Sequence, residues 1–311
     1  MILDPVSLGI DVSKHWLDIG FGSQGPVRRI ANAAEAIEAF VEGLGEPPDL
    51  IVFEATGRYD RQLRLVLVRH GLRFARVAPG RARDFARALG LHAKTDAIDA
   101  RMLAAMGERL DLQATVPVEA SRDRLAMLLR RRDQLVAMRQ QERLRLGEAE
   151  PEECDGLERH LAFLDGEICV IEARIRQALR DCDDLARQER LLRSVPGIGP
   201  VAATVLLALM PELGTLSSKA AAALAGLAPF NHDSGKKRGQ RCIDGGRKRV
   251  RDALYMAAVT AARSSSRFAE SATAMRARNK PFKLVMIAIA RKILVTANAI
   301  IRHNTPFNHA R

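Results

Sequence analysis

The chain has 311 residues, of which 47% are apolar, and it carries a formal net charge of +12 with a pI near 10.2. Its length favours about two domains, and its apolar content excludes intrinsic disorder. Only 4% of the residues are aromatic, with Trp16 as the single tryptophan, which argues against a protein that mainly stacks bases on aromatic side chains. The basic pI points to an anionic partner, either nucleic acid or an acidic membrane surface.

The four cysteines form no C-x-x-C pair, so we expect neither a disulfide framework nor a zinc site, and we expect a reducing compartment. The N-terminus, MILDPVSLGID, lacks the basic and apolar regions of a signal peptide. The apolar run at residues 201–210, which is interrupted only by Thr204, is far shorter than the roughly 20 residues of a membrane-spanning helix. These observations predict a soluble cytoplasmic protein without a membrane partner.

The positive charge is concentrated in the last quarter of the chain. Residues 232–311 contain 18 Lys and Arg against 4 Asp and Glu, a net charge of +14, whereas the other 231 residues have a net charge of −2. Most of these basic residues are arginines, which suit bidentate contacts with phosphate. The alternative is a solvated basic face that serves only solubility.

The first third of the chain alternates strand and helix patterns, which predicts an α/β domain. We expect strands at 6–13, 15–21, 27–31, 50–55 and 72–79, and helices at 34–44, 61–71, 80–89 and 95–109. The middle is helical, with one helix at 120–146, a break at 147–156, and a heptad pattern of apolar residues from 157 to 179. This predicts an antiparallel helical hairpin or coiled coil used for self-association, or a helical linker packed on its own domain.

From residue 190 the chain is again mainly helical. The segment VPGIGPVAATVLLAL places Gly197 and Gly199 in a turn before a helix, a pattern typical of helix-hairpin-helix elements, whose exposed N–H groups bind phosphate. We expect further helices at 217–226, 249–264 and 282–302, and a loop at 228–248.

Four carboxylates are candidate metal ligands. Asp11 ends the first strand, Glu54 ends the strand LIVFE, and Asp96 and Asp99 share one face of a helix. If the two strands are neighbours, these groups converge and need cations to neutralise them. Oxygen ligands select Mg²⁺ or Mn²⁺, and two such ions can act on a phosphodiester. Alternatively, Asp96 and Asp99 are first-turn acids that favour the helix dipole, and Asp11 is a turn residue.

A second cluster surrounds Ser234, in the segment FNHDSGKKRGQRCIDGGRKRVRD. A serine among cations is suited to attack phosphate, because the cations stabilise its alkoxide and the charge that develops on phosphorus. The alternative is a simple surface turn. The candidate phosphate-binding residues of this segment are Lys236, Lys237, Arg238, Arg241, Arg247, Lys248, Arg249 and Arg251.

These segments together resemble the insertion-sequence transposases of the IS110 family (IS110/IS1111/IS116/IS902). The resemblance rests on GIDVSK, VFEATGRYDRQL and ARDFARALGLHAKTDAIDARMLA in the first part of the chain. It also rests on LRSVPGIGPVAATVLLA, on the whole Ser234 segment and on NKPFKLVMIAIARKILVTANAIIR.

The resemblance implies three domains: a ribonuclease H-like (RuvC-like) DEDD domain at 1–115, a coiled coil at 116–188, and a C-terminal transposase domain at 189–311. It further implies that Asp11, Glu54, Asp96 and Asp99 bind Mg²⁺ or Mn²⁺, and that Ser234 forms a transient covalent bond to DNA. The expected partners are donor and target DNA, a structured bridge RNA, and further copies of the chain in a homodimer or homotetramer. The expected location is the bacterial cytoplasm, in association with the nucleoid.

Two other functions remain open at the level of the sequence. One is a metal-dependent junction nuclease in which water is the nucleophile. The other is a nucleic-acid-binding protein without catalysis, in which the acids only cap helices and turns.

Overall fold

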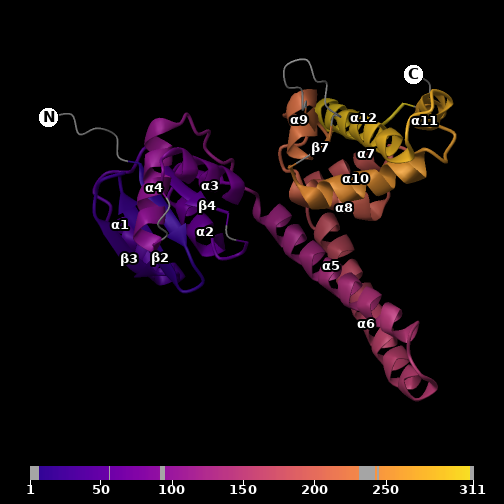
Figure 1. Ribbon diagram of the computed structural model, residues 1–311, viewed down its shortest axis with the longest axis horizontal. Helices are drawn as coiled ribbons and strands as arrows, with labels where there is room; N and C mark the ends of the chain where they lie inside the picture. Colours follow the sequence, from indigo (N-terminus) through magenta and orange to yellow (C-terminus); the bar gives the residue numbers. More distant parts are fainter. Residues whose placement is uncertain (1–6, 56, 92–94, 231–241, 244, 309–311) are drawn as a thin grey trace. The chain divides into compact units, whose positions relative to one another are not determined.

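The computed structural model describes residues 7–55, 57–91, 95–230, 242–243 and 245–308. The chain divides between residues 117 and 118 into two compact units (Figure 1). Unit 1 combines a β-sheet with helices. The described part of unit 2 is almost entirely helical.

Unit 1 is built on a five-stranded mixed sheet with the strand order β3-β2-β1-β4-β5. The strands are β1 (Leu8–Val12), β2 (Trp16–Phe21), β3 (Val27–Ala31), β4 (Ile51–Glu54) and β5 (Phe74–Val77). The first three pair antiparallel, whereas β4 runs parallel to β1 and β5 runs parallel to β4. The predicted α/β character is thus confirmed, and the arrangement is the one expected of a ribonuclease H-like domain.

Helices cover both faces of this sheet. They are α1 (Ala34–Glu42), α2 (Arg61–Arg69), α3 (Pro79–Ala88) and α4 (Asp96–Arg109). Alternate strand residues such as Ile10 and Phe53 pack with Ile37 and Leu63 of α1 and α2. The strand residues between these, such as Val52, point to the opposite face and pack with α4. Because side chains alternate across a strand, Asp11 and Glu54 lie on the face that α4 covers.

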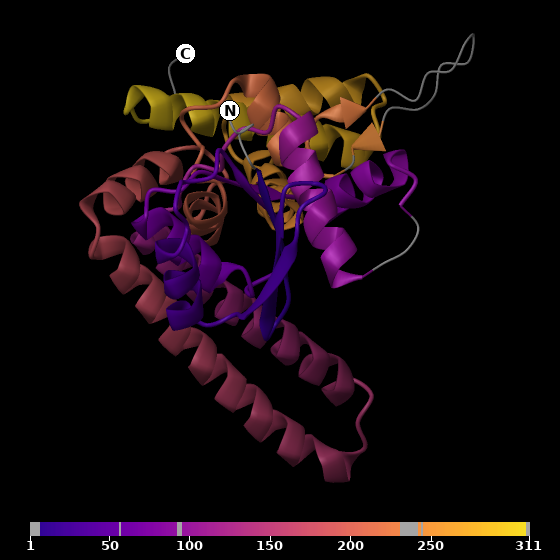
Figure 2. The ribbon, with the colours of Figure 1, turned by 90° about the vertical axis from the view of Figure 1, so that its left-hand side faces the viewer.

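Unit 2 begins with a long helical hairpin, α5 (Ala120–Leu146) and α6 (Pro151–Arg180), whose helices lie side by side in both views (Figures 1 and 2). The heptad positions Leu164, Ile168, Ile171 and Ile175 are buried, as the periodicity predicts. The predicted break at 147–156 is too long, because α6 already begins at Pro151. Glu150 and Glu153 form a capping box there, and proline is well tolerated at the first helical position.

The remaining helices are α7 (Asp183–Arg193), α8 (Pro200–Leu209), α9 (Ser218–Leu224), α10 (Lys248–Ala261), α11 (Arg267–Ala277) and α12 (Phe282–His303). Two short strands, β6 (Pro229–Phe230) and β7 (Cys242–Ile243), pair within the predicted loop. The sequence analysis gave no bounds for a helix at α7 and missed α11. Helix α11 buries only Phe268 and Ala272, so its periodic signal is weak.

One buried apolar cluster extends through unit 2 from Leu125 of α5 to Phe307. Helix α12 lies in this cluster and buries Ile289, Ile293 and Leu294. Within the described residues it is the one helix that is long and apolar enough to cross a membrane, with a mean hydropathy of 1.9. Half of that apolar stretch is buried inside the unit, as in the core helix of a globular protein. The division of this unit at residues 188 and 189 stays a prediction.

Candidate active site

A row of charged side chains crosses the sheet on the face that α4 covers. Ile10 of β1 pairs with Phe53 of β4, so the next residues, Asp11 and Glu54, lie at adjacent strand ends. On the other side of β1, Asp11 pairs with Asp18, and Asp18 pairs with Arg29 of β3. The register therefore places Arg29, Asp18, Asp11 and Glu54 in sequence across four neighbouring strands.

Two glycines bring α4 against this face. Gly9 and Gly20 are paired in the sheet, on the same side as Asp11 and Asp18. A Cβ atom at Gly9 would lie 2.0 Å from the carbonyl oxygen of Ala100, and one at Gly20 would lie 3.0 Å from its carbonyl carbon. Only glycine permits such a close approach of helix and strand backbones. The first turn of α4, with Asp96 and Asp99, is thereby carried to the carboxylate end of the sheet.

Helix α4 also has a regular N-terminus. The hydroxyl of Thr95 accepts a hydrogen bond from the Ile98 N–H at 3.3 Å, and Asp96 and Asp99 lie in the first turn. The acids therefore also favour the helix dipole, as the structural alternative predicted. The two roles are compatible, because a carboxylate that favours a helix dipole can still bind a cation.

The electrostatics of Asp11 show that these carboxylates act on one another. Burial and then the negative charges of Asp99, Asp96, Asp18 and Glu54 raise the pKa of Asp11 from 3.8 to about 6. Each of these causes disfavours the ionised carboxylate. The carboxylate end of the sheet therefore carries negative charge that the protein itself does not fully neutralise.

Arg29 and Asp18 belong to this cluster, although the sequence analysis did not select them. The Arg29 guanidinium donates to both carboxylate oxygens of Asp18, at 2.9 and 3.0 Å, and to Oδ2 of Asp96 at 2.5 Å. Asp18 is buried, and these hydrogen bonds, chiefly those to Asp18, raise the pKa of Arg29. A sequence signal does exist, because an acid inside the apolar run WLDIGF needs a cationic partner.

The donor chemistry of the cluster suits a divalent cation. Carboxylate oxygens are the ligands that Mg²⁺ and Mn²⁺ prefer, and cations would offset the charge that raises the pKa of Asp11. In the structure as it stands, no three His, Cys, Asp or Glu side chains among the described residues are close enough to hold a metal ion. The chemistry of the donors fits, and one or more side chains would have to move to complete the site.

The predicted nucleophile Ser234 lies outside the described residues, as do Lys236, Lys237, Arg238 and Arg241. The described residues on either side of this segment are adjacent, because Pro229 pairs with Ile243 and Phe230 with Cys242. The roles of the five residues remain predictions.

The two glycines of the predicted helix-hairpin-helix turn lie between α7 and α8. Gly197 has a φ of +90°, and a Cβ atom there would lie 2.2 Å from the Ala257 carbonyl oxygen of α10. Gly197 is thus needed for packing within unit 2 whether or not it contacts nucleic acid. Gly199 precedes α8 as its N-cap, and a Cβ atom there would meet no atom within 4 Å.

Among the residues that the structure describes, two of the arginines predicted to bind phosphate, Arg247 and Arg249, pair with carboxylates of unit 2. Arg247 donates to both carboxylate oxygens of Glu212, at 2.6 and 2.7 Å, and to the Leu209 carbonyl at the end of α8. Burial acts to raise the pKa of Glu212, but the hydrogen bonds from Arg247 outweigh it and hold that pKa below its usual value. Arg249 makes a bidentate pair with Asp133 of α5, at 2.6 and 2.9 Å.

The other two basic residues of this segment are held less firmly. Arg251 donates to the Gly245 carbonyl at 2.5 Å. Lys248 pairs with Asp252 one helical turn further along α10, at 2.6 Å, and its side chain is 78% exposed. The structure therefore assigns Arg247 and Arg249 a part in holding unit 2 together, and it leaves Lys248 the most accessible to an anion.

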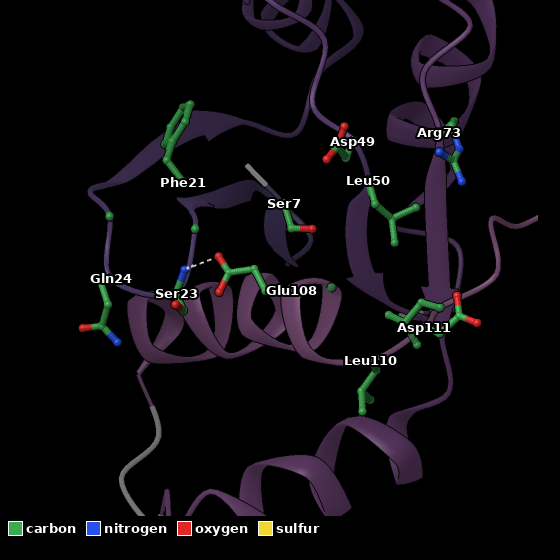
Figure 3. Close-up of a pocket in the computed structure, with 14 residues that line it drawn as sticks. Ser7, Phe21, Ser23, Gln24, Asp49, Leu50, Arg73, Glu108, Leu110 and Asp111 are labelled. Carbon is green, nitrogen blue, oxygen red and sulfur yellow. Dashed lines mark hydrogen bonds between the residues drawn. The ribbon is translucent and has the colours of Figure 1, made fainter. Parts of the chain in front are cut away.

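A hollow of about 730 Å³ lies at the other end of the sheet of unit 1 (Figure 3). Its lining includes Ser7 before β1, Asp49 before β4 and Glu108 near the end of α4. The Glu108 carboxylate accepts a hydrogen bond from the Ser23 N–H at 2.9 Å (Figure 3). This hollow contains none of the predicted site residues, so it is separate from the carboxylate cluster.

Comparison with known proteins relates segments in both units to transposases. A transposase family model of the IS110 DEDD type matches residues 8–149, and the model described as "Transposase IS116/IS110/IS902 family" matches residues 189–273. The pilin gene-inverting proteins of Moraxella lacunata and Moraxella bovis are each 29% identical to the chain over 262 residues. Each alignment covers 83% of this chain and 81% of the relative. The chain belongs to the IS110/IS116/IS902 family of transposases, enzymes that cut and rejoin DNA.

Proposed function

We propose that this transposase moves an insertion sequence by transesterification of DNA, with Ser234 as nucleophile and Asp11, Glu54, Asp96 and Asp99 as ligands of Mg²⁺ or Mn²⁺. The observation that carries the proposal is the convergence of carboxylates from β1, β4 and α4 around Asp11, whose pKa is raised first by burial and then by their negative charges. A protein has little reason to gather such charge without a cation to bind.

The chemistry conserves the number of phosphate ester bonds. The Ser234 oxygen attacks the scissile phosphorus, the bond between phosphorus and the 3′-oxygen breaks, and the serine holds the 5′-phosphate as an ester. The serine gives up its proton, and the leaving 3′-oxygen gains one. Divalent cations, when bound, supply Lewis-acid polarisation of the phosphate and stabilise the leaving oxygen. Another 3′-hydroxyl then attacks the phosphorus of the phosphoserine and gives up its proton. The bond between phosphorus and the Ser234 oxygen breaks, and that oxygen regains a proton, so the strands are rejoined without an external energy source.

Unit 2 supplies the contacts with nucleic acid in this proposal. Residues 232–311 carry the excess of basic side chains, and among the described residues of that range Lys248 has a side chain that is 78% exposed. We assign choice of the donor and target sequence to a structured bridge RNA, so that the protein reads backbone and shape. The α5–α6 hairpin serves self-association into dimers and tetramers, in which the carboxylates of one copy act with Ser234 of another. The protein works in the bacterial cytoplasm, on nucleoid DNA.

The relatives suggest the outcome that the same chemistry can produce. Their name, pilin gene-inverting protein, describes the inversion of a gene. Inversion and insertion differ in which ends are joined. We therefore infer one cut-and-rejoin reaction for this chain, whose outcome depends on the arrangement of its DNA sites.

The decisive experiment looks for the covalent intermediate. The full-length protein is incubated with Mg²⁺, labelled DNA carrying the ends of the element, and RNA transcribed from its non-coding region, and is then run on a denaturing gel. We expect a protein–DNA adduct with the wild type and none with Ser234→Ala. An adduct that persists in Ser234→Ala contradicts the choice of nucleophile. Hydrolysed ends without any adduct support a junction nuclease that uses water, and salt-sensitive binding without cutting supports a non-catalytic binding protein.

A further inference from the structure

Arg29 makes a contact that no part of the proposed reaction uses. Its guanidinium bridges two carboxylates, Asp18 on β2 and Asp96 on α4. We propose that Arg29, anchored by Asp18, holds Asp96 on the β2–β3 side of the sheet, and that a divalent cation competes with Arg29 for Asp96. This inference rests on the proposed function, since it takes Asp96 as a metal ligand.

The strand order explains why we expect Asp96 to bind either Arg29 or a cation near Glu54, and not both at once. Arg29 belongs to β3 and Glu54 to β4, and β2 and β1 lie between them. Three steps of about 4.8 Å separate such strands by roughly 14 Å. The Arg29 guanidinium also donates to Asp18 of β2, so the Asp96 oxygen 2.5 Å from it is held beside Asp18, on the opposite side of β1 from β4 and Glu54. That position agrees with the lack of any three metal-ligating side chains close together among the described residues.

The anchor on Asp18 makes Arg29 a fixed partner. Asp18 is 6% exposed, so its charge needs a cation beside it, and the bidentate geometry satisfies both carboxylate oxygens. Asp96 is exposed and contributes one hydrogen bond to Arg29. When a cation attracts Asp96, Arg29 stays on Asp18 and the exposed contact breaks. Arg29 is thus a positioning residue, and Asp18 is the support that keeps it in place rather than a metal ligand.

Arg28 provides a matched control in the adjacent position of the same strand. It pairs with Ile19, which belongs to the α1 and α2 face, and its guanidinium lies over the ring of Phe40 at 6.0 Å. Arg28→Gln removes the same charge from the same strand without touching Asp18 or Asp96. Any general effect of a lost positive charge on cation binding therefore appears in Arg28→Gln as well.

The test is a calorimetric titration of the full-length protein with Mn²⁺, without DNA, at moderate ionic strength. The variants are Arg29→Gln, Arg28→Gln, Glu54→Gln and the double variant Asp18→Asn/Arg29→Gln. The double variant removes the buried carboxylate together with its partner, so it keeps the test valid if Arg29→Gln alone does not fold. We expect the dissociation constant for Mn²⁺ to fall about threefold to tenfold in Arg29→Gln and in the double variant. Arg28→Gln should change it much less.

Other results overturn the inference in distinguishable ways. Equal changes in Arg29→Gln and Arg28→Gln, or none, mean that Arg29 does not compete for Asp96. Weaker binding in Arg29→Gln means that Arg29 helps Asp96 to bind the cation. In both cases a loss of binding in Glu54→Gln still supports the proposed metal site. If Glu54→Gln binds Mn²⁺ as the wild type does, the proposed metal site is wrong and the competition at Asp96 is wrong with it.

Discussion

Two clusters of charge, one in each unit, differ in how completely the fold neutralises them. At the carboxylate end of unit 1, Asp11 lies among four further acids, and its pKa rises to about 6. In unit 2, Arg247 and Arg249 are each matched by a carboxylate, Glu212 and Asp133. In the first cluster the single cation Arg29 faces several acids, whereas the described arginines Arg247 and Arg249 of the second cluster are matched one to one. A count of charges along the sequence does not show which charges are neutralised, because the neutralising partner of a residue can be distant in the chain.

The largest effect should follow from removing a carboxylate of the proposed metal site. We expect Glu54→Gln to lower the rate of strand cutting by about 10²-fold to 10³-fold, in the range seen when a group that stabilises developing charge is lost. Cleavage of labelled DNA in Mg²⁺ measures this rate, and a normal thermal unfolding midpoint shows that the variant is folded. Cutting at the wild-type rate would show that the reaction does not need the Glu54 carboxylate, and it would contradict the proposed role of this cluster.

The next effect concerns the packing that brings the acids together. Gly9→Ala places a methyl group 2.0 Å from the Ala100 carbonyl oxygen, so α4 must shift. We expect the free energy of unfolding to fall by about 3 kcal/mol or more, as urea denaturation would show. Gly80→Ala in α3 is the control, because its methyl group would meet no atom within 4 Å and should be neutral or slightly stabilising. Similar losses for both variants would mean that α4 does not depend on the glycine contact.

The unneutralised charge on Asp11 should appear in the pH dependence of stability. Its folded pKa of about 6 lies above the ordinary value of 3.8. The native state therefore binds more protons between these values, and its stability falls as the pH rises from about 4 to 6. In EDTA at pH 7 we expect Asp11→Asn to be more stable than the wild type by about 1–2 kcal/mol, after allowance for solvent screening.

This stabilisation should shrink toward zero near pH 4, where Asp11 is protonated in the wild type as well. Thermal unfolding at several pH values in EDTA measures the difference. An equal difference at pH 4 and pH 7 would show that the asparagine acts through packing and that the charge on Asp11 has no part.

The smallest effects should distinguish Arg249, which stabilises unit 2 through its pair with Asp133, from the exposed Lys248. A double-mutant cycle with Arg249→Gln and Asp133→Asn should give a coupling of about 1 kcal/mol in urea denaturation, because the pair is bidentate and partly buried. Lys248→Gln should change stability by less than about 0.5 kcal/mol. It should also lower the salt dependence of DNA binding by about one unit of slope. The comparison fails if Lys248→Gln destabilises unit 2 more than Arg249→Gln does.

The sequence by itself determined the local elements and the order of the chemistry-bearing residues. Periodicity located the five strands of unit 1, the heptad face of α6 and the helix that begins near Asp96, because each pattern arises from residues close together in the chain. It also placed Asp11 and Glu54 at the ends of strands. Family resemblance added the roles that we propose for these acids and for Ser234.

The tertiary structure alone decided which distant residues meet. The register of β1, β2 and β3 brought Asp18 and Arg29 beside Asp11, and the glycine pair set the approach of α4. The long-range pairs of Arg247 and Arg249 separated structural arginines from the accessible lysine. Register and ion pairing depend on contacts between residues far apart in sequence, and local patterns carry little information about them.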